Sequence, residues 1–121
     1  THGEGGLDEI TPTGTTWVAE LKGGAVSTFE LQPGDAGLAT SSLDDLKGGD
    51  ADYNAAALTA VLGGEKNAYR DAAIMTAGAA LLVADEASDL KQGTALAGAA
   101  IDNGAAAQAL ARLVAISNDR G

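Results

Sequence analysis

The chain has 121 residues, which is enough for one domain or for a part of one. It has no cysteine, so disulfides and thiolate sites are excluded, and its net charge of −10 argues against a nucleic-acid partner and against docking on an anionic membrane. Apolar residues make up 45% of the chain, which allows a packed core, although many of them are alanines that bury little area.

The chain starts at Thr1 rather than at a methionine, which indicates a processed, trimmed or excised polypeptide. We expect no signal peptide, and the longest apolar run, Ala77 to Ala84, is too short to cross a membrane. Together with the absence of cysteine, these features lead us to expect a cytoplasmic protein.

Turn-forming residues mark the irregular segments. Residues 1–14 are predicted to be a loop, because glycines and a proline interrupt them too often for a regular element. Pro33 and Gly34 suit the central positions of a type II turn. Ser42 is predicted to cap a short helical turn over residues 42–45.

Residues 15–31 are predicted to form a β-hairpin around residues 23–24, a Gly-Gly pair that tolerates positive φ. A two-residue turn would pair Trp17 with Glu30, whereas a three-residue turn would pair it with Leu31. We expect the three-residue turn, because it collects the large apolar side chains on one face and a slip by one residue exchanges the faces.

Four helices are predicted after the hairpin. Asp50 caps the first, which ends at the glycines of residues 63–64, and the second covers residues 67–84. Ser88 caps the third, and residues 103–104, an Asn-Gly pair, separate it from the fourth. The residues expected on the apolar faces are Leu58, Val61, Leu62, Leu90, Thr94, Ala97, Ile101, Leu110, Leu113 and Val114.

A hairpin followed by about four helices, over residues 50–118, reads as an α+β arrangement with a polar tail at residues 118–121. An isolated hairpin is marginally stable in water. The helix over residues 67–84 is nearly apolar all round from Ala72 on, which is typical of a helix buried on every side. Both features lead us to expect a larger sheet and further helices in the complete protein.

Two adjacent acids, Asp8 and Glu9, follow a glycine-rich stretch in the loop of residues 1–14. Carboxylate oxygens on a loop suit Mg²⁺, which takes one or two carboxylates and keeps waters that substrate phosphates can replace. Taken alone this signal is weak, since adjacent acids in a loop are more often only solvated.

The other polar candidates favour structural roles. His2 is the only histidine, so a histidine-based metal site or triad is excluded, and a lone loop histidine is more often structural. Trp17 is expected to pack within its strand. Lys66 and Arg70 are expected to be surface charges, and the two acids of residues 44–45 to cap a turn rather than to bind a metal.

The run HGEGGLDEI at residues 2–10 resembles the HGxxGLDE segment of the anthranilate phosphoribosyltransferases. The likeness continues through the hairpin and then through short motifs in the order and spacing of that family. Among these motifs are Gly48-Gly49-Asp50, Gly64-Glu65-Lys66, Arg70-Asp71-Ala72 and Ala100-Ile101-Asp102. Each motif is moderately specific, but their collinear order over most of the chain makes a chance match improbable.

The resemblance implies that residues 1–121 are the C-terminal part of an α/β domain of the nucleoside phosphorylase and phosphoribosyltransferase kind. It implies a transfer of phosphoribosyl from phosphoribosyl pyrophosphate to anthranilate, a step of tryptophan biosynthesis, in a homodimer. By position in the motif, it assigns Asp8 and Glu9 to Mg²⁺.

The same resemblance places the diphosphate loop and the anthranilate contacts of the family upstream of the residues present here. We therefore assign no catalytic residue within the chain, leave its substrate-binding residues unassigned, and predict that the chain alone is inactive. Two alternatives stay open: a paralogue of the same fold, such as a nucleoside phosphorylase or a nucleic-acid-binding relative, and a non-catalytic module that associates with itself.

Overall fold

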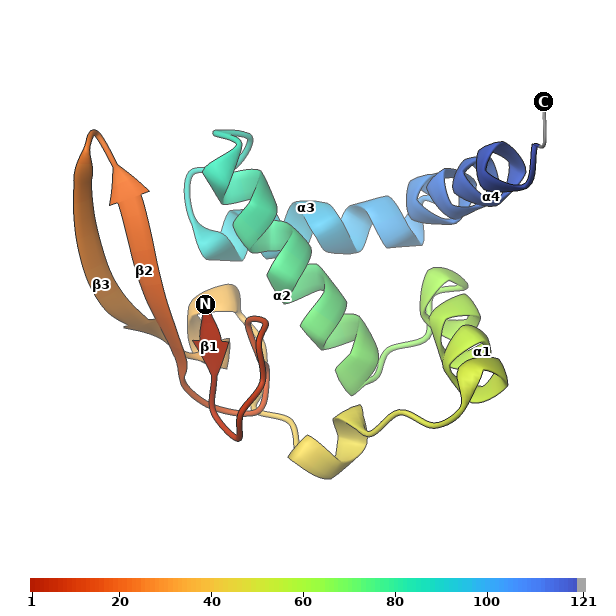
Figure 1. The fold of residues 1–121 in the computed structure, drawn as a ribbon, viewed down its shortest axis with the longest axis horizontal. Helices are drawn as coiled ribbons and strands as arrows, with labels where there is room; N and C mark the ends of the chain where they lie inside the picture. The colour runs from red at the N-terminus through yellow and green to blue at the C-terminus, as the bar shows by residue number, and fades with distance from the viewer. Residues whose placement is uncertain (120–121) are drawn as a thin grey trace.

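The structure is a computed structural model that describes residues 1–119, so the last two residues of the predicted polar tail lie outside the described part. A small sheet stands at one side of the molecule, and the helices lie beside and beyond it (Figure 1). The elements in chain order are β1 (His2–Gly3), β2 (Thr16–Lys22), β3 (Ala25–Leu31), the 3-10 helices η1 (Pro33–Ala36) and η2 (Leu43–Leu46), α1 (Ala51–Leu62), α2 (Ala68–Val83), α3 (Leu90–Asp102) and α4 (Ala105–Asn118).

The sheet has three antiparallel strands in the order β1-β2-β3, so the segment predicted as a loop contains a short strand. β1 pairs with the start of β2, with His2 opposite Trp17 and Gly3 opposite Thr16. The prediction of a continuous loop over residues 1–14 is therefore wrong at these two residues. A strand of two residues is too short to show the alternation by which strands are predicted.

The hairpin of β2 and β3 is confirmed, but its predicted register is wrong. Trp17 lies opposite Glu30 rather than opposite Leu31. The turn has two residues, because Gly23 and Gly24 both have positive φ, 59° and 81°. Two consecutive positive φ angles are what a type I′ turn requires, and its twist matches that of the flanking strands.

This register divides the apolar side chains of the hairpin between its two faces. Val18 lies opposite Phe29, and Thr16 lies opposite Leu31, which packs against the buried core. On the other face, the Trp17 indole Nε1 donates a hydrogen bond of 3.0 Å to the Glu30 carboxylate. Leu21 and Val26 lie opposite each other on this second face, so the large apolar side chains are not collected on one face as the three-residue turn predicted.

The type II turn predicted at Pro33 and Gly34 is wrong. These residues start η1, and Gly34 lacks the positive φ that a type II turn needs. The Asp35 carboxylate accepts a hydrogen bond of 2.7 Å from the Gln32 N–H, which favours the helical turn. Gly37 ends the segment with φ of 76°.

Side-chain caps set where the helices begin. Asp50 caps α1 and Ser42 caps η2, as predicted. The predicted cap of α3 is off by one residue, because the Asp89 carboxylate, not Ser88, accepts the hydrogen bond of 2.7 Å from the Gln92 N–H. Serine and aspartate are about equally good N-caps, so the sequence does not decide between neighbours of this kind.

The core consists of two apolar clusters that meet at α2. One cluster joins the loop before β2 to η1, α2 and α3, and the other joins α1 to α2 and α3. Their buried members are Ile10, Ala36, Met75 and Leu90 in the first, and Val61, Ile74, Ala97 and Ile101 in the second. Both clusters also include residues of α3, so the crossing pair of α2 and α3 forms the centre of the core (Figure 1).

Helices α2 and α3 cross in backbone contact. A Cβ atom on Gly78 of α2 would lie 2.5 Å from the Thr94 nitrogen and 2.8 Å from the Gly93 carbonyl carbon. Gly78 and Gly93 are both buried. The two glycines let the helices approach more closely than any side chain would allow.

Arg70 is not the surface charge that the sequence predicted. It is 6% exposed, and its guanidinium forms an ion pair of 2.8 Å with Asp102 and a hydrogen bond of 3.4 Å to the Gly98 carbonyl. Arg70 Nη1 has no hydrogen-bond partner among the described residues. Burial raises the pKa of the next side chain, Asp71, and the Arg70 charge partly offsets that rise.

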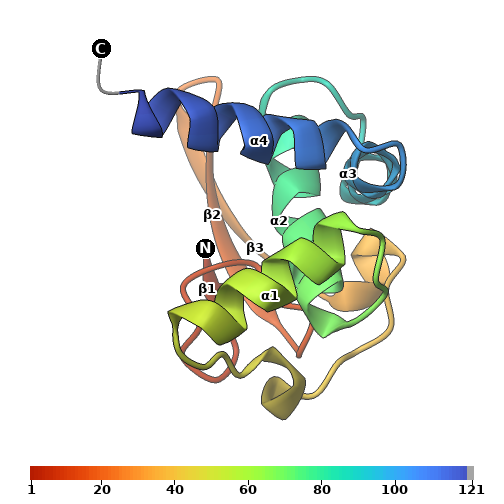
Figure 2. The ribbon, with the colours of Figure 1, turned by 90° about the vertical axis from the view of Figure 1, so that its right-hand side faces the viewer.

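Apolar side chains remain exposed on α2 and α4. The helix predicted to be buried on every side is buried on one face, and Val83 at its end is 84% exposed. α4 has no buried residue in the described part of the chain, and Ile116 is 75% exposed. Figure 2 shows α1 and α4 apart from each other, in front of α2 and the sheet.

No helix among the described residues is both long enough and apolar enough to serve as a membrane span.

Candidate functional site

The loop that carries the predicted metal ligands is a tight turn beside β1. Gly3 and Leu7 exchange two backbone hydrogen bonds, of 2.7 and 3.2 Å. Gly5 and Gly6 lie between them with φ of 82° and 85°, angles that other residues rarely adopt. The turn therefore brings the chain back along β1, and the acidic pair follows directly after it.

Asp8 and Glu9 are both exposed, and no side chain within residues 1–119 donates to either carboxylate. The one hydrogen bond at this pair goes to the backbone, from the Thr1 hydroxyl to the Asp8 carbonyl at 2.9 Å. The two carboxylates are thus free to accept a ligand, and as hard oxygen donors they fit Mg²⁺.

The described residues supply no third ligand at this position. No group of three or more histidine, cysteine, aspartate or glutamate side chains gathers anywhere in residues 1–119 to hold a metal. Two carboxylates fit an ion that keeps several waters and meets substrate phosphates, and they do not form a closed protein cage.

Buried threonines that were not predicted from the sequence hold the other end of the loop. The Thr11 N–H donates to the Thr16 hydroxyl at 3.1 Å, and both residues are 1% exposed or less. The Thr11 and Thr13 hydroxyls lie 2.6 Å apart in a further hydrogen bond. The threonine-rich run TPTGTT at residues 11–16 was the available signal, since threonine hydroxyls readily bond to nearby backbone.

His2 and Trp17 have structural contacts. Their rings stack with centroids 5.8 Å apart and planes inclined by 27°. Trp17 is 44% exposed, so it packs only partly within its strand. The two rings, together with Phe29 and Glu30, line a shallow cavity of about 570 Å³.

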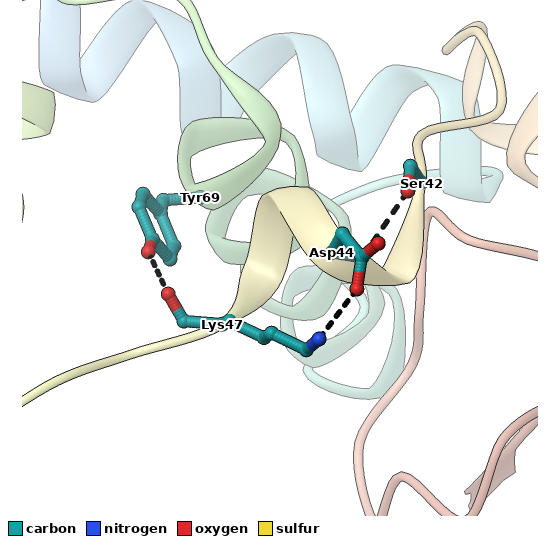
Figure 3. A network of polar contacts seen from close by, with 4 residues as sticks. All are labelled: Ser42, Asp44, Lys47 and Tyr69. Carbon is teal, nitrogen blue, oxygen red and sulfur yellow. Dashed lines mark hydrogen bonds and ion pairs between the residues drawn. The ribbon is translucent and has the colours of Figure 1, made fainter.

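The Asp45 carboxylate of η2 accepts a hydrogen bond of 3.3 Å from the Ser42 N–H, so it caps the turn as predicted. Asp44 belongs to a polar network with Tyr69 (Figure 3). The Asp44 N–H donates to the Ser42 hydroxyl at 3.1 Å, and the Asp44 carboxylate pairs with the Lys47 ammonium at 2.6 Å. The Tyr69 hydroxyl donates to the Lys47 carbonyl. Hydrogen bonding with Tyr53 and, to a smaller extent, desolvation raise the pKa of the Tyr69 phenol.

The comparison with protein families matches residues 1–107 to the glycosyl transferase family, a/b domain. Two similar relatives are the anthranilate phosphoribosyltransferases of Parvibaculum lavamentivorans, 53% identical over 98% of this chain, and of Afipia carboxidovorans, 59% identical over 96% of it. The chain covers 35% and 34% of their lengths.

Solved structures give the same result. The anthranilate phosphoribosyltransferase of Thermus thermophilus superposes with a TM-score of 0.84 and 38% identity, over 94% of this chain and 33% of that one. The Saccharomyces cerevisiae enzyme in complex with 4-fluoroanthranilate superposes with a TM-score of 0.80 and 27% identity, over 90% of this chain and 32% of that one. The chain therefore spans about a third of the length of the relatives it matches, and the predicted resemblance and fold class are confirmed.

Proposed function

Because the chain belongs to the glycosyl transferase family, through its a/b domain, we propose that it serves as the C-terminal third of an anthranilate phosphoribosyltransferase. The observation that carries this proposal is collinear identity of 53% to 59% with enzymes of that name over 96% to 98% of the chain. The strong acidity of the chain, at −10, disfavours the nucleic-acid-binding alternative.

The proposed reaction joins the amino nitrogen of anthranilate to C1 of the ribose in phosphoribosyl pyrophosphate. A C–N bond forms as the C–O bond to pyrophosphate breaks, the leaving group takes the electron pair, and the amino group loses a proton. Mg²⁺, when bound, offsets the charge that builds on the leaving diphosphate. Asp8 and Glu9 would hold that ion at the edge of the site.

Three features support the assignment of Asp8 and Glu9 to Mg²⁺. The two carboxylates are exposed and unpaired within residues 1–119, they follow a turn fixed to the sheet, and they match the acidic pair of the family motif. One solved relative, a variant of the Saccharomyces cerevisiae enzyme, is described with Mg bound.

An assay of the complete protein tests the proposed function. Anthranilate is fluorescent, so its loss in the presence of phosphoribosyl pyrophosphate and Mg²⁺ reports the transfer directly. We expect turnover that requires all three components. Phosphorolysis of a nucleoside by inorganic phosphate, without any consumption of anthranilate, would instead support the phosphorylase alternative.

The homodimer and the cytoplasmic location that the sequence predicted belong to the same proposal. Light scattering of the complete protein after size exclusion measures the first, and fractionation of the producing cells measures the second.

A further inference from the structure

One carboxylate ties the turn of the acidic loop to the sheet. The Glu4 N–H donates to the Thr15 carbonyl at 2.8 Å, and the Thr15 N–H donates back to Glu4 Oε2 at 3.0 Å. A hydrogen bond that a backbone N–H donates to a carboxylate is about twice as strong as one between neutral groups. The pair extends the contact between β1 and β2 beyond their last ladder residues.

Gly14 leaves the space in which this carboxylate sits. A Cβ atom on Gly14 would overlap Glu4 Oε2 and would lie 3.0 Å from Glu4 Cδ. Gly14 does not have a positive φ, so the glycine is needed here for room and not for backbone conformation. The atom in the way is the end of a flexible side chain, so a methyl group at this position would displace the carboxylate rather than the backbone.

The anchored turn is the support of Asp8 and Glu9. The two glycines within it, Gly5 and Gly6, contribute little stiffness of their own, because glycine is conformationally permissive. The bonds of Glu4 to Thr15 fix the turn where it leaves the sheet. The bonds between Gly3 and Leu7 keep the turn closed, so it moves as a unit together with the acidic pair that follows it. Without the carboxylate bond, only one backbone hydrogen bond at Glu4 holds this unit against β2, and the direction of the acidic pair is less fixed.

We propose that Glu4 is a positioning residue for the magnesium site, acting through its bond to the Thr15 N–H and its seat against Gly14. This inference rests on the proposed function. Glu4 is not placed as a ligand, because Glu4 Oε2 accepts from the backbone and no three acids gather within residues 1–119. Its role is to fix the direction in which Asp8 and Glu9 present their oxygens.

Three variants of the complete enzyme test this role. Glu4→Ala removes the carboxylate, Gly14→Ala displaces it while keeping it in the chain, and Glu4→Gln keeps an oxygen that can accept the bond. Two control variants match these changes: Glu20→Ala removes an exposed charge elsewhere in the sheet, and Gly34→Ala adds a methyl group in open space.

The probe is Mn²⁺, whose free-ion electron paramagnetic resonance signal reports the bound fraction, with Mg²⁺ as competitor. Loss of an outer-shell group that hydrogen-bonds a metal ligand costs about 10-fold to 100-fold in affinity. Glu4 acts through the backbone and not on a ligand directly, so we expect at most the lower end of that range, about 10-fold, for Glu4→Ala and Gly14→Ala. We expect Glu4→Gln to recover most of the affinity and both controls to bind normally. Saturating Mg²⁺ should restore kcat, because the ligands themselves remain.

The outcomes separate this inference from the proposed function. The double variant Asp8→Asn/Glu9→Gln is measured alongside. If it loses Mn²⁺ while Glu4→Ala and Gly14→Ala bind it as tightly as the parent, the positioning role is overturned and the metal assignment stands. If the double variant also binds normally, both are overturned.

Discussion

The crossing of α2 and α3 predicts that one buried glycine cannot be replaced by alanine although another can. In Gly78→Ala the new methyl group would lie 2.5 Å from the Thr94 nitrogen and 2.8 Å from the Gly93 carbonyl carbon. Ordinary contacts need about 3.5 Å, so the helices would have to separate by about 1 Å. The atoms in the way belong to backbone and cannot rotate aside.

Two opposing effects set the size of the change. Overpacking of a core costs about 1–3 kcal/mol, whereas replacing a mid-helix glycine by alanine gains up to about 1 kcal/mol. We expect Gly78→Ala to lower the free energy of unfolding by about 1–2 kcal/mol. For a domain of this size, that corresponds to a fall in Tm of about 4–8 °C.

Gly98→Ala is the matched control, because Gly98 is also buried in a helix but has room for a methyl group. The nearest atom to its Cβ would be an Arg70 guanidinium nitrogen at 3.6 Å, an ordinary contact. We expect this variant to be as stable as the parent or slightly more stable. Thermal unfolding followed by circular dichroism at 222 nm measures both, and a Gly78→Ala variant as stable as Gly98→Ala would refute the close crossing.

Three further predictions concern the ion pair, the tyrosine network and the isolated chain. Asp102→Ala leaves the Arg70 guanidinium buried without its partner. Because Asp102 is itself half-exposed, we expect the free energy of unfolding in urea to fall by about 1–2 kcal/mol, less than for a fully buried pair. An unchanged unfolding midpoint would contradict the pairing. The pKa of Tyr69 is raised, so the stabilisation of its protonated phenol is complete below the ordinary value of about 10 and is lost as the pH rises through the raised value. Absorbance at 295 nm should show Tyr69 ionising at a higher pH than an ordinary tyrosine, and Tyr53→Phe should lower its pKa. A Tyr69 titration that Tyr53→Phe does not change would exclude Tyr53 as the cause of the raised pKa. The 121-residue chain alone should not consume anthranilate with phosphoribosyl pyrophosphate and Mg²⁺, and robust turnover would refute the prediction that the rest of the active site lies outside it.

Features encoded within a few neighbouring residues could be predicted from the sequence. The Asp50 cap, the position of the hairpin turn at the Gly-Gly pair and the helix break at residues 103–104 are all where they were expected, although the turn is one residue shorter than predicted. In each case the residue type itself favours the local conformation, by accepting an N–H bond or by adopting positive φ.

Features that depend on distant contacts could not be predicted in this way. The hairpin register was predicted wrongly because the large apolar side chains were expected to share one face, whereas the structure follows the two-residue turn that a Gly-Gly pair favours. Arg70 was predicted to be exposed because nothing near it in the sequence reveals Asp102, its partner from another helix.

In the candidate site, too, residues that belong to a local motif could be predicted, and a contact between distant residues could not. Asp8 and Glu9 were singled out by the likeness of residues 2–10 to a family motif, since two adjacent acids alone are a weak signal. The bond between Glu4 and Thr15 joins residues 11 positions apart, and it becomes visible only once β1 lies against β2.

The proposed function depends most on the acidic pair holding Mg²⁺, and the dependence of anthranilate consumption by the complete protein on the Mg²⁺ concentration tests this directly. Asp8→Asn/Glu9→Gln is compared with Asp44→Asn/Asp45→Asn, which removes the same charge from an adjacent pair in η2. We expect the Mg²⁺ concentration for half-maximal consumption of anthranilate to rise about 10-fold or more in the first variant and to stay unchanged in the second. Normal turnover at the parent's Mg²⁺ concentration by Asp8→Asn/Glu9→Gln would contradict the role assigned to this loop.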